Sequence, residues 1–282
     1  MLTTPLSEPS VRPHDGPAPL SPWQRCVGHS GYIAEGLLYL VVGCFALLAA
    51  LGRQQPNGSK GALAKLGGSG FGDALLALLA IGLAAFVTWQ FVLAVADPEH
   101  RADRGTARRR LVRLGHLSNG LFHVVFVGEA VWSLLGLASA DNERETQVQW
   151  TARAMAVPAG RYVIALIGAS IVVFGLWQFY RAVTRDKNKR VDLSHTRLRF
   201  AIDVLGVYGL AARGVLFALV GGYLINAAWR HDPRYSGGIA GALGGMKQQP
   251  YGEWLLGAVA GGLICYGLYQ IAKERFRRLG DS

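Results

Sequence analysis

The side chains best suited to chemistry occupy one position in three similar segments. Each segment reads glycine, three residues, a polar residue and glycine, and each opens a long apolar run: 31–36, 115–120 and 209–214. The polar residue is Glu35 in the first segment, Asn119 in the second and Arg213 in the third. A charge inside a bilayer costs ~2.5–3.5 kcal/mol even on the mildest scale. The pattern therefore predicts that Glu35 and Arg213 pair, with Asn119 beside them.

Three glutamines form a second polar set. Of the ten glutamines in the chain, only three lie in apolar runs, and each follows an aromatic residue: Gln90, Gln178 and Gln270. Eighteen residues before each of them, a glycine is followed by an ionisable residue: Gly72-Asp73, Gly160-Arg161 and Gly252-Glu253. A shared frame of this kind indicates a repeated structural unit.

Depth along the helices relates these two sets. At a rise of 1.5 Å per residue, Glu35, Asn119 and Arg213 lie about 9–15 Å from the start of their helices. The glutamines lie near the same membrane surface, because their runs travel in the opposite direction. Buried polar groups in a bilayer bond to one another. Two interpretations stay open: a structural belt that ties the repeats together, or a site for an ion or an anionic headgroup.

Two histidines extend the polar set in the third apolar run. His116 and His123 lie three residues before and four residues after Asn119, so all three share one helical face. Such a stripe suits a proton relay or a ligand site, and it equally suits histidines that are held by hydrogen bonds in a packed interior. Glu129 lies deeper and off this face, which predicts a separate, lone acid.

Six apolar runs must position these residues, and each is about 20 residues long: roughly 31–51, 74–96, 114–137, 162–183, 204–228 and 254–272. A helix of this length crosses a hydrocarbon core of ~30 Å, whereas the strands of a membrane barrel would alternate polar and apolar residues. We therefore predict an all-α membrane protein. Its six transmembrane helices form three tandem two-helix repeats of the same orientation around a pseudo-threefold axis.

The frame also divides the chain. We expect a disordered tail followed by three repeats: 1–24, 25–98, 110–186 and 198–278. The loop between the two helices of each repeat mixes glycine and proline with apolar residues. These loops are expected to be short amphipathic segments at the outer membrane surface, with a re-entrant loop as the alternative.

The net charge of +11 reflects topology. Of the 29 Lys and Arg, 19 lie in the two termini and the two linkers between repeats, 9 lie in the three alternate loops, and Arg213 is the remaining one. Basic segments stay in the cytoplasm, which predicts a bacterial inner-membrane protein with both termini inside. The basic face attracts anionic lipid headgroups, and nucleic acid is not an expected partner. Three cysteines without CxxC spacing predict neither a disulfide nor a metal site.

The layout resembles a family of bacterial integral membrane proteins known as domain of unknown function 1206, which consists of tandem two-helix repeats. The resemblance covers about residues 25–275 and rests on the glycine-flanked openings and on the second helices with their Gly-Ala-Leu segments and glutamines. Gly-Ala-Leu occurs at 61–63 and 241–243, whereas the second repeat has Gln149-Trp150-Thr151 there and Asn119 in place of a charge. The resemblance implies the fold and carries no activity with it.

Three classes of function fit these observations. The first is a structural or accessory membrane subunit, or a protein that binds a membrane partner. The second is a channel or transporter for an ion or small solute, and the third is a lipid or quinone binder. We expect no enzyme and no cofactor, because the sequence has no nucleophile motif, no metalloprotease motif and no dinucleotide fingerprint.

Overall fold

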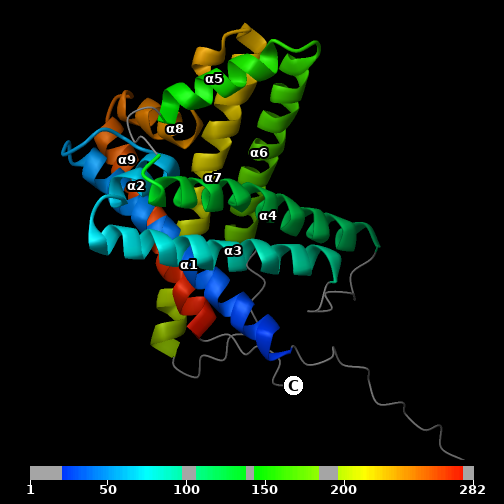
Figure 1. Ribbon diagram of the computed structural model, residues 1–282, viewed down its shortest axis with the longest axis vertical. Coiled ribbons are helices and arrows are strands. Elements are labelled where there is room, and N and C mark those ends of the chain that lie inside the picture. Colours follow the sequence, from blue (N-terminus) through cyan, green and yellow to red (C-terminus); the bar gives the residue numbers. More distant parts are fainter. Residues whose placement is uncertain (1–20, 97–105, 138–142, 184–195, 276–282) are drawn as a thin grey trace, which may run out of the picture.

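The computed structural model describes residues 21–96, 106–137, 143–183 and 196–275 (Figure 1). This part of the chain contains no strand. It forms nine α-helices and one 3-10 helix: α1 (Pro22–Ala50), α2 (Ser59–Leu66), α3 (Gly70–Val95), α4 (Thr106–Leu134), α5 (Glu143–Met155), α6 (Gly160–Val183), α7 (Thr196–Arg230), η1 (Pro233–Tyr235), α8 (Gly238–Lys247) and α9 (Gly252–Arg275).

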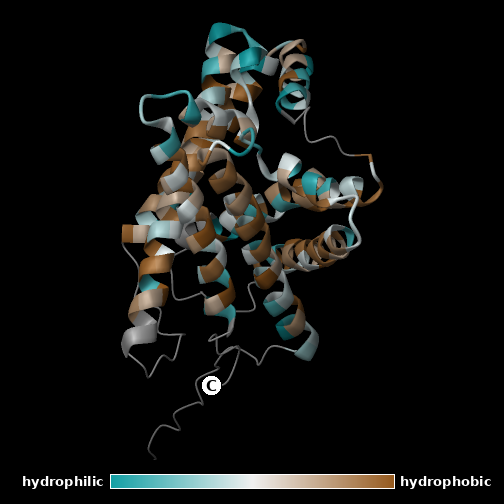
Figure 2. Cartoon of the chain, turned by 90° about the vertical axis from the view of Figure 1, so that its left-hand side faces the viewer, coloured by the Kyte–Doolittle hydropathy of each residue, from teal (hydrophilic) through white to brown (hydrophobic). Residues whose placement is uncertain are grey.

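Six of these helices are long and apolar enough to cross a bilayer: α1, α3, α4, α6, α7 and α9. Hydrophobic residues run along them, and hydrophilic residues gather mainly at the ends (Figure 2). A short helix, α2, α5 or α8, joins the two long helices of each repeat, where the sequence predicts short surface segments. The all-α, six-span architecture is confirmed.

The first helix begins inside the segment that the sequence assigns to the tail. α1 starts at Pro22, whose fixed φ suits the first turn of a helix. The side chain of Gln24 accepts a hydrogen bond from the backbone N–H of Ser21 at 2.9 Å. Residues 22–24 are therefore helical, and residues 1–20 lie outside the described part of the chain.

A glycine stands where each second span follows its short helix. A Cβ at Gly72 would lie 1.7 Å from the carbonyl oxygen of Leu66, and one at Gly160 would lie 1.8 Å from that of Ala154. At Gly252 the same atom would lie 2.2 Å from the carbonyl oxygen of Lys247. Only glycine fits such contacts, which explains the repeated glycine before the ionisable residue.

The repeats contact one another through equivalent helices. The second helix of each repeat packs against the first helix of the next: α3 against α4, α6 against α7, and α9 back against α1. The closing glycine of each opening segment lies at these junctions. Gly36 approaches Gly267 of α9, Gly120 approaches Gln90 of α3, and Gly214 approaches Gly175 of α6. This arrangement is consistent with the pseudo-threefold axis.

The second repeat departs from this symmetry. α1 packs against α3 and α7 against α9, but the described parts of α4 and α6 do not pack along each other in this way. In Figure 1, α3 and α4 run together across the long axis, whereas α6 and α7 run together along it. A Cβ at Gly31 or Gly209 would come within 2.6 Å of the second helix of its own repeat, while one at Gly115 meets no described atom within 4 Å.

Candidate functional site

The opening charges of the first and third repeats form a buried ion pair. Arg213 Nη1 of α7 lies 3.3 Å from Glu35 Oε1 of α1. The two residues are 2% and 1% exposed, so neither charge reaches the surrounding lipid or water. Burial of this kind is tolerated only when the two charges and their remaining hydrogen-bonding atoms find partners.

Helix α9 supplies two of those partners. The hydroxyl of Tyr266 donates to Glu35 Oε1 at 3.1 Å and accepts a hydrogen bond from Arg213 Nη1. The side-chain amide of Gln270 donates to the other carboxylate oxygen, Glu35 Oε2. Both oxygens of the carboxylate are therefore held by groups on α9, and Tyr266 bridges the two charges.

Helix α4 completes this cluster, which we call the central cluster: Glu35, Asn119, His123, Arg213, Tyr266 and Gln270. Arg213 Nη2 donates to Asn119 Oδ1 at 3.4 Å. His123 Nδ1 lies 2.8 Å from the backbone oxygen of Asn119, which can only accept, so the Nδ1 atom carries the proton of this hydrogen bond. The opposite ring nitrogen, Nε2, faces Glu35 Oε1 at 3.7 Å. Glu35, Asn119 and Arg213 thus come together from three repeats.

Aromatic rings enclose the guanidinium of Arg213. Its central carbon lies 4.7 Å from the ring centroid of Tyr266 and 4.8 Å from that of Tyr39. Phe217 of the same helix and Phe174 of α6 lie 5.3 and 5.7 Å away. Faces of aromatic rings attract a cation and exclude water at the same time. The cluster is therefore a desolvated ion pair that is surrounded by hydrogen-bond donors, hydrogen-bond acceptors and aromatic rings from all three repeats.

The other predicted polar residues lie outside this cluster. The Gln90 Oε1 atom contacts His116 Nδ1 at 3.1 Å, which links α3 to α4. The Gln178 Oε1 atom accepts from Arg181 of its own helix at 3.2 Å. The histidine stripe therefore splits, because His116 bonds to the first repeat's second helix while His123 joins the central cluster.

Glu129 is not the lone acid that the sequence suggests. Its Oε1 atom lies 3.6 Å from Lys60 Nζ of α2, and the two side chains are about one-fifth exposed. The pair connects the short helix of the first repeat to the first helix of the second. The sequence pattern misses it because Lys60 belongs to a loop segment with no fixed spacing from Glu129.

Comparison with known proteins identifies the repeats. The sequence model of the family described as Domain of Unknown Function (DUF1206) matches residues 30–97, 114–185 and 208–277. The chain belongs to the DUF1206 family. It is also 31% identical over 261 residues to the Bacillus subtilis (strain 168) protein described as "Uncharacterized protein YxxB", covering 92% of this chain and 93% of the relative. No solved structure matches the chain.

The frame of the DUF1206 repeats accounts for the whole cluster. Glu35, Asn119 and Arg213 each stand five residues after the start of a family match. Four residues further along the first helices stand Tyr39, His123 and Phe217, and four residues before the glutamines stand Phe86, Phe174 and Tyr266. Sequence reasoning missed the aromatic members of these sets, although their equivalent positions were visible in the aligned repeats.

The cluster is suited to holding helices together. Its ionisable members are Glu35, Arg213, His123 and Tyr266, and their polar atoms largely bond to one another. In the described residues, no group of three or more His, Cys, Asp or Glu could hold a metal ion. The chemistry that this arrangement supports is a specific, desolvated link between repeats.

Proposed function

We propose that this protein is an accessory membrane protein, a helical scaffold whose second repeat associates within the bilayer with a helix of another membrane protein. The observation that carries the proposal is the uneven burial of the repeats. In the most apolar stretches of α4 and α6, 28% and 22% of the residues are buried, against 50% or 56% in the other four spans.

The central cluster supports the scaffold part of this proposal. Its polar side chains come from four helices, α1, α4, α7 and α9, and bond mainly to one another. A helix pair in a bilayer gains little from the hydrophobic effect, so packing and interhelical hydrogen bonds must provide specificity. We assign the cluster a holding role and no catalytic step or cofactor.

The second repeat has an exposed seam, the faces of α4 and α6 that carry Gly115, Ser118 and Ser170, and the first and third repeats indicate what covers it. A Cβ at Gly82 would lie 2.4 Å from the Cβ of Ala34, and one at Gly262 would lie 2.2 Å from that of Ala212. The equivalent residues of the second repeat are Ser170 and Ser118, and both are exposed. Where the first and third repeats pack two helices together through small residues, the second repeat presents small residues at the equivalent positions, and they are uncovered. A transmembrane helix with a small-residue face suits this seam.

We further propose a location in the bacterial inner membrane with both termini in the cytoplasm and anionic headgroups at the basic face. In a variant without the native cysteines, a membrane-impermeant thiol reagent applied from outside should label a cysteine placed at Gln55, which is exposed in the loop before α2, or at Asp141. It should leave a cysteine at Asn188 unlabelled. Labelling of position 188 from outside would contradict this topology.

Association through the second repeat predicts position-specific cross-linking. A photoreactive amino acid at Leu121 of α4 or Leu166 of α6 should give one defined protein adduct in native membranes. The same group at Ile81 of α3 should not, although Ile81 is 73% exposed and the other two are 64% and 69% exposed. An adduct of twice the chain's mass would identify the partner as a second copy.

A bulky residue in the seam provides the control. Gly115→Leu should abolish the adduct formed from Leu121 without lowering the melting temperature, because a Cβ at that position would have no described atom of another element within 4 Å. Equal adducts from all three positions, or adducts that persist in Gly115→Leu, would count against a docking role for the second repeat.

A further inference from the structure

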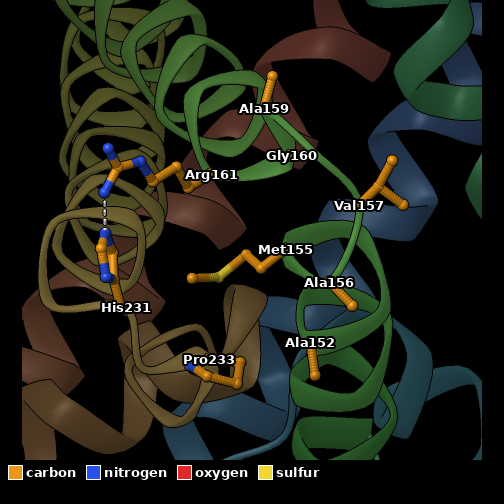
Figure 3. Close-up of a pocket in the computed structure, with 9 residues that line it drawn as sticks. All are labelled: Ala152, Met155, Ala156, Val157, Ala159, Gly160, Arg161, His231 and Pro233. Carbon is orange, nitrogen blue, oxygen red and sulfur yellow. Dashed lines mark hydrogen bonds between the residues drawn. The ribbon is translucent and has the colours of Figure 1, made fainter.

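A cavity of about 440 Å³ lies where α5 ends, α6 begins and α7 ends (Figure 3). Its wall is largely apolar, and a histidine and an arginine stand at one side. Met155, Val157, Arg161, His231 and Pro233 are among the residues that line it. The cavity combines a hydrophobic surface with a local positive charge.

The two basic side chains contact each other directly. Arg161 Nη1 donates to His231 Nε2, as the dashed line in Figure 3 shows, so the ring proton of His231 is on Nδ1. The guanidinium also lies over the ring of Tyr162, 4.5 Å from its centroid. Within the described ranges, no carboxylate lies at ion-pair distance from Arg161. Among the described residues, therefore, no acid compensates its positive charge.

Both residues lie at positions that are unfavourable for their residue types: His231 because of its backbone conformation, and Arg161 because of the helix dipole. His231 has φ 54°, a left-handed conformation at the end of α7 that favours glycine. Arg161 stands in the first turn of α6, where α3 and α9 carry the acids Asp73 and Glu253. An acid is stabilised at a helix N-terminus by the helix dipole, and a base is not. At this position the second repeat thus carries a base where the other two repeats carry an acid.

The surroundings place the cavity at a membrane surface. Trp150, Tyr162 and Trp229 are all more than half exposed near its edges, and such aromatic residues concentrate at the level of lipid headgroups. We propose that the cavity binds a phosphate group through Arg161 and His231, with the apolar wall receiving the carbons attached to it. The guanidinium fork and the His231 Nδ1–H are the donors, and two sources of ligand share this chemistry: a phospholipid and a free phosphate ester.

The test measures ligand binding to the purified full chain in phosphatidylcholine nanodiscs by native mass spectrometry. Dihexanoyl phosphatidic acid and inorganic phosphate are the two probes. Arg161→Gln should weaken binding about tenfold or more, because it removes charge-assisted hydrogen bonds. Arg153→Gln removes the same charge from the same end of the molecule, outside the cavity lining, and should change binding less than about twofold.

The two probes distinguish the sources. Tighter binding of the dihexanoyl lipid supports a phospholipid, and equal binding of both probes supports a free phosphate ester. If Arg161→Gln lowers the melting temperature, Arg161→Lys keeps the charge but not the planar fork and should still weaken binding. Binding of neither probe, or equal losses in Arg161→Gln and Arg153→Gln, would overturn the proposal.

Discussion

Replacing Arg213 with alanine is expected to lower the free energy of unfolding by ~3–5 kcal/mol, because it leaves the buried carboxylate of Glu35 without its counter-charge. The same change removes the hydrogen bond to Asn119 and the cation that the four aromatic rings enclose. Thermal melting and denaturant titration in detergent micelles or nanodiscs would measure the loss.

Arg230→Ala is the matched control for this prediction. Arg230 lies on the same helix and is exposed, and its contacts are with Asn226 and Tyr235 near the end of α7. Its loss should change stability by less than ~1 kcal/mol. Similar effects of the two substitutions would show that Arg213 has no special place in the interior.

The second large effect concerns the glycines that open each repeat. Gly31→Leu and Gly209→Leu should each destabilise the protein by ~3 kcal/mol or more, because even a Cβ there would lie 2.6 Å from the backbone of Phe86 or Tyr266. Gly115→Leu should change stability by less than ~1 kcal/mol, because α4 is open at that point. Melting temperatures of the three variants in the same nanodiscs would provide the comparison.

These glycines occupy one position in three repeats, so the series isolates the packing of each repeat. A large loss for Gly115→Leu would mean that α4 and α6 close against each other as the other pairs do. That result would remove the uncovered seam on which the proposed docking role depends.

The pairing of Glu35 with Arg213 could be foreseen because two simple facts coincide. Equivalent positions of repeats around one axis come close together, and an acid and a base in a bilayer each need a partner. The role of Tyr266 could not be foreseen in this way. A tyrosine in an apolar run looks like ordinary packing or like an interfacial aromatic, and only the structure shows its hydroxyl between the two charges.

The three glutamines show that an equivalent position in the repeats does not predict an equivalent hydrogen-bond partner. Gln90, Gln178 and Gln270 are all buried and equivalent, yet only Gln270 reaches Glu35. The position looks the same in each copy, but its partner depends on the neighbouring first helix. For Gln270 that helix is α1, which presents the carboxylate of Glu35. For Gln90 it is α4, which presents His116.

The sequence predicts only in part that the second repeat is open, with the described parts of α4 and α6 not packed against each other. Ser118 and Ser170 replace the alanine and glycine that meet in the other two repeats, and these replacements are visible in the aligned frame. Their consequence for the packing of α4 and α6 depends on tertiary contacts, because α4 is held by α3 and α6 by α7. Single-chain patterns do not reveal which of two competing helix partners prevails.

Glu35 and Arg213 form one desolvated pair at the meeting point of the three repeats. A double-mutant cycle with Glu35→Ala, Arg213→Ala and the combined variant tests it most directly. The double variant should be more stable than the sum of the two single losses implies, by at least ~1 kcal/mol, because removing both charges leaves no buried charge unpaired. Strictly additive losses in the free energy of unfolding would contradict it.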